Sequence, residues 1–345
     1  MKILHVGGAD KFMPAYIELV RENFNFSQHE FLLRSGMCNI LPCPQIRVYE
    51  RTVVDRIRFY IMAFVKMHYS NRVILHGLFD IKFAFILFFT PWLLKKCYWV
   101  MWGGDLYAYK RERKNKGWKR KEFFRRPVIK KMGHLVTYIG GDVRLARKWY
   151  GATGKYHECL MYPSNLYKEY DVTANKSSGI NIQVGNSADP SNNHIEVLEM
   201  LLPFKDDDIA IYVPLSYGDL KHAKKVIRQG QKWFGDKFIP LTEYMPFEQY
   251  LNLLGSIDIA LFNHKRQQAM GNAITLLGLG KTVYLRSDTT QWQLFQQKKI
   301  VIGDIEKLKS LETLDTEGNK EIIKNQFSEQ KLIEQLKEVF YGLSH

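Results

Sequence analysis

Short apolar runs alternate with longer amphipathic stretches over the whole chain. The apolar runs predict strands at Lys2–Val6, Arg72–Leu75, Cys97–Met101, Leu135–Ile139, Asn181–Val184, Ile209–Val213, Ile257–Phe262, Thr282–Leu285 and Lys299–Ile302. Between most of them, apolar residues recur at helical spacing, for example in Asn192–Leu202, Asp219–Phe234, Phe247–Leu254 and Ala273–Leu279. This alternation is typical of an α/β fold in which helices cover both faces of parallel sheets.

The length of the chain predicts two domains, since 345 residues exceed one ordinary core and suit two domains of about 150 residues. A polar, breaker-rich segment from Pro163 to Gly179 falls near mid-chain and is interpreted as the hinge region. We therefore expect an N-terminal domain over 1–165 and a C-terminal domain over 166–327. After Ser328 the tail 328–345 has apolar residues at helical spacing, which predicts a final helix that can pack back on the first domain.

Composition excludes some classes of protein. A hydrophobic content of 46% with 14% aromatic residues rules out intrinsic disorder. The four cysteines (Cys38, Cys43, Cys97 and Cys159) form no CxxC pair, which argues against a disulfide framework or structural zinc and for a reducing cytoplasm. A net charge of +15 favours phosphate-rich partners, which are nucleic acid, an anionic bilayer face or phosphorylated small molecules.

The most apolar window runs from Phe83 to Leu94 and contains Pro91. Its twelve residues are fewer than the roughly 20 that a membrane-spanning helix needs. A buried core helix is the favoured interpretation, and a helix whose apolar face dips into a membrane surface is the alternative. The N-terminus lacks the long apolar stretch of a signal peptide.

A basic run from Lys110 to Lys131 holds twelve cations against two acids, which is most of the net charge. Aromatic residues are interleaved with the cations, a combination that favours an anionic membrane surface. The residues predicted to contact the membrane are Lys110, Arg111, Arg113, Lys114, Trp118, Lys119, Arg120, Lys121, Phe123, Phe124, Arg125 and Arg126. A merely solvated basic helix is one alternative. Nucleic-acid binding is another, although no nucleic-acid module accompanies the charge.

The segment 184–194 has the clearest chemical content, because it is polar and lies directly between a predicted strand and a predicted helix. Gly185 allows a sharp turn, while Asn186, Ser187 and Ser191 offer polar groups beside a helix N-terminus. Such a loop predicts an anion site, with an ordinary capped turn as the alternative. Neither the GxGxxG fingerprint nor a GxxxxGK[ST] phosphate loop occurs here.

A second polar segment, 262–272, also follows a predicted strand. His264, Lys265 and Arg266 bring positive charge to the carboxyl end of that strand, where a diphosphate could be neutralised. Gly271 would allow close backbone approach before the next helix, beside Asn272. Two such loops in one domain predict a nucleotide-diphosphate site.

In the first half, the segment Trp99–Tyr107 contains two Trp, two Gly and one Asp after a predicted strand. Flat aromatics beside small residues suit a sugar face, and Asp105 could act as general base toward a hydroxyl. His76, at another strand end, is a second candidate for base or orienter. The residues expected to line the acceptor side are Gly7, Gly8, Trp102, Gly103 and Gly104.

The triplet Asp206–Asp208 formally contains a DxD pattern, which in some transferases holds a metal. Here the triplet precedes a predicted strand instead of following one, so we interpret it as a surface turn and expect no metal.

These loops together resemble glycosyltransferase family 56, the TDP-N-acetylfucosamine:lipid II N-acetylfucosaminyltransferases. The matching stretches are HG-x-F at His76–Phe79, W-x-x-WG-x-DLY at Trp99–Tyr107, VGNS-x-D-x-SN-x-HI at Val184–Ile195, VP at Val213–Pro214 and RQQ-x-x-G at Arg266–Gly271. They follow one another over nearly the whole chain, and the VGNS stretch is the most specific.

The resemblance implies a GT-B fold, with two Rossmann-like domains facing across a cleft and the donor nucleotide mostly on the second. It implies transfer of 4-acetamido-4,6-dideoxygalactose from a TDP donor to a polyprenyl-diphosphate-linked saccharide, peripherally at the cytoplasmic face of the inner membrane. By position, the donor residues would be Gly185, Asn186, Ser187, Asp189, Asn193, His194, Arg266, Gln267, Gln268 and Gly271, with Asp105 and His76 facing the acceptor.

No cofactor is expected beyond the nucleotide-sugar co-substrate, and no nucleic-acid partner. Two alternatives stay open at this point. One is a transferase for another nucleotide sugar in capsule or O-antigen assembly, and the other is a non-catalytic protein that binds nucleic acid or an anionic surface.

Overall fold

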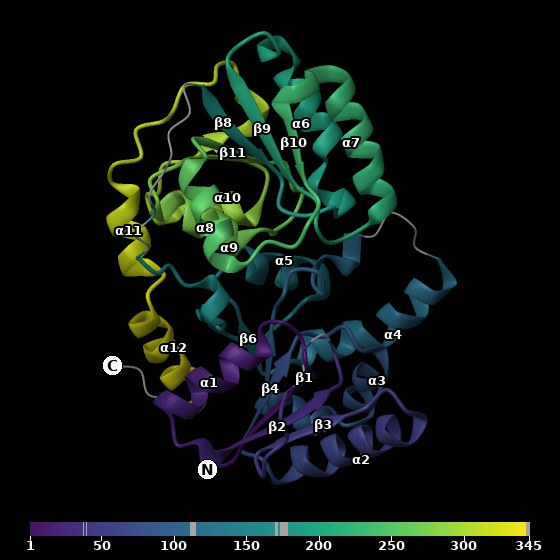
Figure 1. The fold of residues 1–345 in the computed structure, drawn as a ribbon. Helices are drawn as coiled ribbons and strands as arrows, with labels where there is room; N and C mark the ends of the chain where they lie inside the picture. Colours follow the sequence, from purple (N-terminus) through teal and green to yellow (C-terminus); the bar gives the residue numbers. More distant parts are fainter. Residues whose placement is uncertain (37, 39, 111–114, 170–171, 173–178, 343–345) are drawn as a thin grey trace. The chain divides into compact units, whose positions relative to one another are not determined.

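The computed structural model describes residues 1–36, 38, 40–110, 115–169, 172 and 179–342. The chain forms two compact units, each with its own parallel sheet (Figure 1). The first unit comprises Met1–Ser164 with Glu329–His345, and the second comprises Asn165–Ser328. The expected domains were 1–165 and 166–327, with a separate tail from 328.

The first unit contains a seven-stranded sheet in the order β3-β2-β1-β4-β5-β6-β7. Its strands are β1 (Ile3–Gly8), β2 (His29–Arg34), β3 (Ile46–Tyr49), β4 (Arg72–His76), β5 (Cys97–Val100), β6 (His134–Val136) and β7 (Lys155–His157). Every neighbouring pair is parallel. The carboxyl ends of the strands therefore gather at one edge, where ligands of open α/β sheets bind.

Six helices surround this sheet: α1 (Met13–Asn23), α2 (Val53–Tyr69), α3 (Ile81–Phe89), α4 (Lys116–Lys131), α5 (Gly140–Tyr150) and α12 (Glu329–Tyr341). Apolar residues of α2, α3, α4 and α5 join one core with the strands. Helix α12 packs against β1 and β2 through Phe340, whose ring lies 4.8 Å from that of His29 and 5.8 Å from that of His5. The tail, for which a final helix was predicted, thus forms α12 and belongs to the first unit.

The second unit contains a six-stranded parallel sheet in the order β10-β9-β8-β11-β12-β13. Its strands are β8 (Ile180–Val184), β9 (Ile209–Pro214), β10 (Phe238–Leu241), β11 (Ile259–Phe262), β12 (Thr282–Leu285) and β13 (Gly303–Asp304). Its helices are α6 (His194–Leu201), α7 (Leu220–Phe234), α8 (Phe247–Ser256), α9 (Met270–Gly278), α10 (Thr290–Gln297) and α11 (Asn319–Gln326). Strands β8 and β11 are central neighbours, so the loops that follow them lie side by side.

The predicted strand at Lys299–Ile302 is wrong. Lys299 has a positive φ of 58°, and the N–H of Ile300 donates to the carbonyl of Phe295, so this apolar segment is the turn that ends α10. The strand begins only at Gly303. Strands β2, β3, β7 and β10 were not predicted, because short strands that carry charged residues or Pro240 give little apolar signal.

The apolar window beginning at Phe83 forms α3 and then the 3₁₀ turn η2 (Pro91–Lys96). Within the described residues, no helix is both long and apolar enough to cross a bilayer. The triplet Asp206–Asp208 is exposed and precedes β9, at the amino end of that strand, as expected for a surface turn.

Candidate functional site

The loop after β8 folds around the side chain of Asn192. Gly185 has a φ of +68°, and a Cβ there would lie 2.7 Å from both Asn192 Oδ1 and His194 Nε2. Glycine is therefore required by backbone conformation and by space. The N–H of Asn186 donates to Asn192 Oδ1 at 2.9 Å, while Asn192 Nδ2 donates to Ser187 Oγ at 3.3 Å. The polar residues predicted from the sequence thus hold one another in a fixed turn.

The loop after β11 joins the loop after β8 through three side-chain contacts. His264 Nε2 lies 2.9 Å from Asn192 Oδ1, and Ser191 Oγ lies 2.8 Å from Gln268 Oε1. Asn193 Nδ2 donates to the carbonyl of Asn263 at 2.7 Å. The two loops predicted to act together therefore converge on one site, which we call the loop-pair site (residues 185–194 and 263–272).

Buried polar atoms without a partner gather at the loop-pair site. In the described chain they include Gln183 Oε1, Asn186 Oδ1, His194 Nε2, Asn263 Nδ2, His264 Nδ1 and Gln291 Nε2. Native proteins leave few buried polar groups unpaired, so a cluster of them marks a place where a ligand or water supplies the missing bonds. Gln291, in α10, was not predicted, since no loop motif surrounds it in the sequence.

The loop-pair site combines neutral histidines with two cations, Lys265 and Arg266, and one carboxylate. Burial, followed by nearby His222, lowers the pKa of His194 to about 3, and burial with nearby Arg266 lowers that of His264 to about 3. Burial alone would raise the pKa of Asp189. Hydrogen bonds from the hydroxyl and the N–H of Ser191, together with the nearby charge of Arg266, have the larger effect, so the pKa of Asp189 is lowered. At neutral pH, Arg266 therefore faces an ionised Asp189 among uncharged imidazoles.

The remaining predicted donor residues lie at the start of α9. Gly271 and Asn272 are in its first turn, and Asn272 Oδ1 accepts from the Tyr250 hydroxyl at 3.0 Å. The Gln267 carbonyl accepts from Arg266 Nη1 at 3.2 Å. Sequence reasoning missed Arg286, whose Nη1 donates to Asn263 Oδ1 at 3.3 Å.

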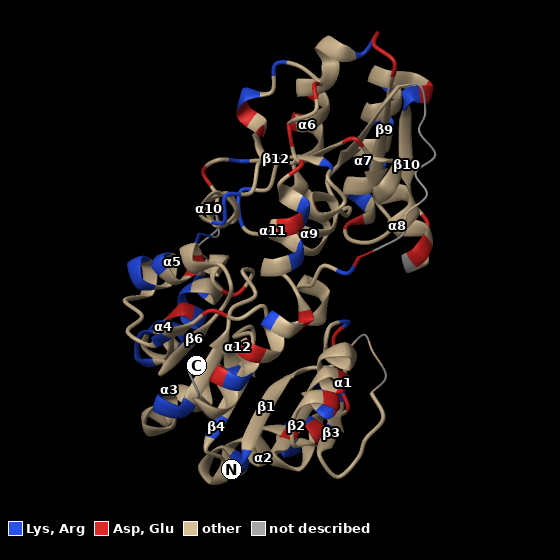
Figure 2. Cartoon of the chain, turned by 90° about the vertical axis from the view of Figure 1, so that its left-hand side faces the viewer, with Lys and Arg blue, Asp and Glu red and all other residues tan. Residues whose placement is uncertain are grey.

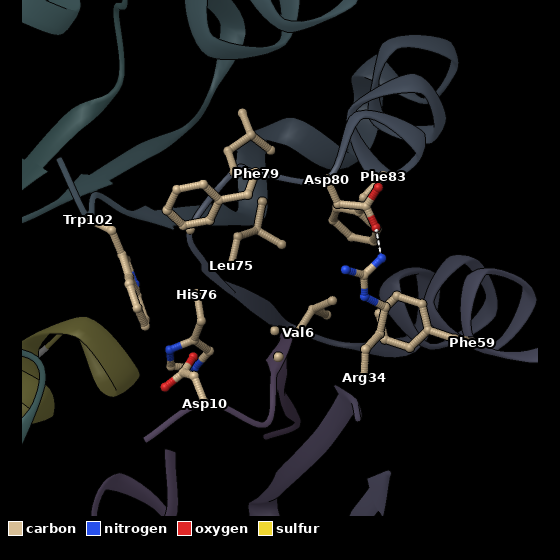
Figure 3. A pocket seen from close by; sticks show the side chains of 14 residues that line it. Val6, Asp10, Arg34, Phe59, Leu75, His76, Phe79, Asp80, Phe83 and Trp102 are labelled. Carbon is tan, nitrogen blue, oxygen red and sulfur yellow. Dashed lines mark hydrogen bonds and ion pairs between the residues drawn. The ribbon is translucent and has the colours of Figure 1, made fainter. Parts of the chain in front are cut away.

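The first unit has a cavity of about 280 Å³ at the carboxyl ends of β1 and β4. It is lined by Val6, Gly7, Gly8, Asp10, Arg34, Phe59, Leu75, His76, Gly77, Leu78, Phe79, Asp80, Phe83 and Trp102. Figure 3 shows Asp10, His76 and Trp102 on one side of this pocket and Arg34, ion-paired with Asp80 at 2.6 Å, on the other. Gly7, Gly8, His76 and Trp102 were predicted to lie here, whereas Gly103 and Gly104 are not among the lining residues.

His76 belongs to a buried chain of hydrogen-bonded rings. Its Nδ1 lies 2.6 Å from the Tyr162 hydroxyl and its Nε2 lies 3.2 Å from His5 Nδ1, while His5 Nε2 lies 3.0 Å from His29 Nδ1. The Trp102 indole, which can only donate, points its N–H at the same Tyr162 hydroxyl at 3.1 Å. The Tyr162 hydroxyl therefore donates to His76 Nδ1. In the same direction along the chain, His76 Nε2 donates to His5 Nδ1, and His5 Nε2 donates to His29 Nδ1.

Both ring nitrogens of His76 are thus engaged, and burial lowers its pKa to about 3. The predicted role of His76 as a base is not supported by this geometry, because no nitrogen is left for a substrate proton. The ring instead positions Trp102 through Tyr162.

The carboxylate of Asp105 is also fully occupied. Its Oδ2 accepts from the N–H of Leu78 and from Trp99 Nε1, and its Oδ1 accepts from the N–H groups of Trp102 and Leu106, at 2.7–3.0 Å. Four donors fill the lone-pair sites of a carboxylate, and the residue is only 1% exposed. The expectation that Asp105 is the general base is therefore not supported, and the side chain holds the loop after β5 against the loop after β4.

Asp10 is a carboxylate that the sequence analysis did not select, and it lines the pocket. Its Oδ1 accepts from the N–H of Phe12 at 2.9 Å, and burial raises its pKa despite that bond. A raised pKa makes a carboxylate a better proton acceptor near neutral pH. The available signal was an acid two residues after the Gly7-Gly8 pair that ends β1.

The basic run contains one residue that does not match its predicted role. Arg125 is buried, paired with Glu122, and donates from Nη2 to the carbonyl of Asp105 at 2.6 Å, so it cannot contact a membrane. The exposed members are Lys110, Lys119, Arg120, Lys121, Phe123 and Arg126, whereas Trp118 and Phe124 are half-buried. Arg111, Arg113 and Lys114 lie outside the described residues.

The chain is similar to one known family and, in fold, to several solved structures. A profile of the family described as 4-alpha-L-fucosyltransferase, glycosyl transferase group 56, matches residues 10–326. The structure of Alr3699/HepE from Anabaena in complex with UDP-glucose aligns with a TM-score of 0.68 at 9% identity, covering 99% of this chain and 100% of that one.

Two further structures align over similar lengths. Sucrose-phosphate synthase from Thermosynechococcus elongatus has a TM-score of 0.64 at 9% identity, covering 99% of both chains. WaaG, a glycosyltransferase involved in lipopolysaccharide biosynthesis, has a TM-score of 0.58 at 10% identity, covering 98% of this chain and 94% of its own. At such identities the likeness is one of fold, and the two parallel sheets with their helices are those of a GT-B protein.

Proposed function

Since the chain belongs to glycosyltransferase group 56 and is a glycosyltransferase, we propose that its loop-pair site holds a nucleoside-diphosphate sugar. The observation that carries this proposal is the convergence of the two loops at His264 and Asn192 around unpaired buried polar atoms. Alr3699/HepE, which shares the fold, was solved with UDP-glucose, and this supports a nucleotide sugar as the donor class. We propose TDP-linked 4-acetamido-4,6-dideoxygalactose, by resemblance to the family.

In this proposal the loop-pair site meets the charge that grows on the departing nucleoside diphosphate. Arg266 supplies a positive charge, and the amide of Asn263 and the imidazole of His194 supply donors already fixed in place. Donors preorganised in this way stabilise developing charge without reorganisation. The single carboxylate of the two loops, Asp189, accepts from Ser191 instead, so we propose a metal-independent transfer.

We propose that the acceptor hydroxyl binds in the pocket of the first unit and that Asp10 takes its proton. The hydroxyl oxygen forms the bond to the anomeric carbon as the bond to the diphosphate breaks, and the proton passes to the Asp10 carboxylate. The faces of Trp102 and Phe79, which line the pocket, suit a sugar ring. Asp105 holds the backbone N–H of Trp102 and so positions one of these rings.

The proposed acceptor is a saccharide linked to a polyprenyl diphosphate, used by a peripheral enzyme at the cytoplasmic face of the inner membrane for bacterial surface polysaccharide synthesis. The exposed cations of α4, including Lys119, Arg120 and Lys121, support an anionic membrane partner. WaaG, which shares the fold, acts in lipopolysaccharide biosynthesis, and this supports a role in surface polysaccharides.

A ligand-dependent unfolding experiment tests the donor. The protein is heated with TDP, UDP, GDP or a short oligonucleotide, and a nucleotide at 100 times its Kd should add about 2.7 kcal/mol of stability. Stabilisation by TDP alone supports the proposal. Stabilisation by UDP or GDP alone would show that the donor carries that nucleotide and not TDP. A response only to the oligonucleotide, lost in salt, would identify a nucleic-acid-binding protein and overturn the proposed function.

A further inference from the structure

Helix α2 carries apolar residues on both of its faces. Phe59, Ala63 and Met67 point into the core of the first unit and are at most 2% exposed. On the outer face, Ile57, Ile61 and the neighbouring Phe64 and Val65 follow at helical spacing, and Ile61 is 59% exposed. A helix that is apolar all round is normally buried on all sides. The outer face of α2 is therefore more apolar than that of an ordinary surface helix, although Arg56 and Arg58 are also exposed on this helix.

The exposed face continues from α2 onto α3 and α4. The Phe64 ring lies 4.7 Å from that of His68, whose Nε2 accepts from Trp92 Nε1 at 3.3 Å just beyond the end of α3. From α3, Phe85 contacts Phe124 and Phe88 contacts Phe123, with ring centroids 5.0 and 5.9 Å apart. We call this surface the α2–α4 face, defined by Ile57, Ile61, Phe64, Val65, Phe85, Phe89, Trp92 and Phe123, all of which are exposed.

The whole net charge of the protein lies in the sequence segment that contains this face. Residues 51–131 contain 20 Lys and Arg against five Asp and Glu, and the rest of the chain contains 30 of each sign. Three of the five acids do not present an unpaired negative charge at the surface, because Asp80 pairs with Arg34 while Asp105 and Glu122 are buried. Figure 2 shows Lys and Arg in blue along α3 and α4.

We propose that the α2–α4 face docks on an anionic bilayer, with the apolar side chains of α2, α3 and Trp92 entering the boundary between headgroups and acyl chains. The surrounding cations then lie against lipid phosphates, the arrangement typical of amphipathic helices that rest on a membrane. Nucleic acid would neutralise the cations but leave the aliphatic side chains of α2 in water. A second copy of the chain would bring two surfaces of the same charge together.

The docked surface has a direct connection to the pocket. Phe59 and Phe83, which line the pocket, come from the inner faces of α2 and α3, the helices whose outer faces are exposed. A lipid-borne saccharide would therefore reach the pocket along helices that lie on its own membrane. This second step rests on the proposed function, whereas the docking itself does not.

Vesicle binding tests the docking. The variant Ile61→Ser with Val65→Ser removes two exposed aliphatic side chains of the α2–α4 face, and Leu41→Ser with Val301→Ser removes two exposed elsewhere. Because binding scales with the apolar area that enters the membrane, the first pair should weaken partitioning onto phosphatidylglycerol-containing vesicles by roughly tenfold. The second pair should bind like the parent, and both pairs should keep the parent's Tm. Vesicles of phosphatidylcholine alone, or high salt, should bind the parent less.

Several outcomes would overturn the proposal. If both double variants bind vesicles as well as the parent protein does, α2 does not contact the membrane. Conversion of a parent dimer to a monomer by the Ile61→Ser, Val65→Ser pair, with vesicle binding unchanged, would identify a second copy as the occupant. The nucleotide unfolding experiment uses no lipid, so docking without a nucleotide response would overturn the proposed function and leave the membrane contact standing.

Discussion

The two sheets of this protein end in sites of opposite character. At the pocket of the first unit, no lining residue has a buried side-chain nitrogen or oxygen without a partner, and all of these residues lie in the described chain. At the loop-pair site of the second unit, Asn263, His264 and Gln291 each leave a buried polar atom unpaired. Both sheets are parallel, and the loop after β4 at the pocket and the loop after β8 at the loop-pair site both begin at a glycine, so topology does not cause the difference.

The difference indicates how each site selects its ligand. In the first unit the polar groups around Trp102 bond to one another and fix that ring, so the pocket offers Asp10 beside apolar walls that select by shape. The second unit holds donors and acceptors in place for a ligand that completes them. Unpaired buried groups cost stability, and a site keeps them when a bound molecule supplies the missing bonds.

The largest expected effect comes from Asp10→Asn, which removes a pocket carboxylate whose pKa is raised by burial. An amide of the same shape cannot take a proton, so the transfer rate should fall by about 10²–10⁴ while TDP-induced stabilisation is unchanged. Single-turnover transfer and thermal unfolding measure the two quantities. In the matched variant Asp105→Asn, the loss should be mainly of stability, because two of the four donors would face an amide N–H₂ group that cannot accept their hydrogen bonds. If Asp105→Asn abolishes transfer at full stability and Asp10→Asn does not, Asp105 is the base.

Arg266→Ala tests the polar site of the second unit. Loss of a charge aimed at the departing diphosphate should lower turnover by about 10²–10³. Lys265→Ala is the control, since it removes the same charge from the adjacent, exposed position and should change turnover little. Equal losses in steady-state rate for the two variants would assign the effect to general electrostatics and not to the site.

The histidines behind the pocket should make stability depend on pH. Burial lowers the pKa of His29 to about 4 and that of His76 to about 3. Burial also lowers the pKa of His5. The unfolded chain takes up these protons below about pH 6.5, so their contribution is fully present above that pH and is lost as the pH falls toward 4. His29→Gln should reduce the slope of the unfolding free energy against pH by up to about 1.4 kcal/mol per pH unit, as measured by urea unfolding at several pH values. An unchanged slope would contradict the buried neutral state of His29.

The smallest expected effects distinguish the glycines of the two sites. Gly185→Ala forces a positive φ on alanine and displaces Asn192, and should cost about 1–2 kcal/mol in urea unfolding. A Cβ at Gly8 meets nothing within 4 Å, so Gly8→Ala should leave stability unchanged. The added methyl group should instead narrow the pocket and raise the KM for the acceptor. A stability loss at Gly8 equal to that at Gly185 would remove the contrast between the sites.

Much of the fold could be predicted from the sequence because buried strands of parallel sheets are continuous apolar runs. The strand Thr282–Leu285 was predicted to the residue. Prediction failed where an apolar run is not a strand. The apolar residues of Lys299–Ile302 lie in a turn instead. Prediction also failed at β10, where Pro240 lies in a strand at the edge of the sheet.

The sequence by itself determined the family, the two parallel sheets and the two polar loops after β8 and β11, because glycines, strand ends and helix starts are local features. Only the tertiary structure decided which carboxylate lines the pocket. Asp105 has the stronger motif but is enclosed by donors from two loops, whereas Asp10 keeps pocket exposure and a raised pKa. The same holds for the apolar outer face of α2, since the periodicity of a helix does not tell which of its two apolar faces will be covered. Burial and hydrogen-bond saturation depend on residues distant in sequence, and these decide which groups remain available for chemistry.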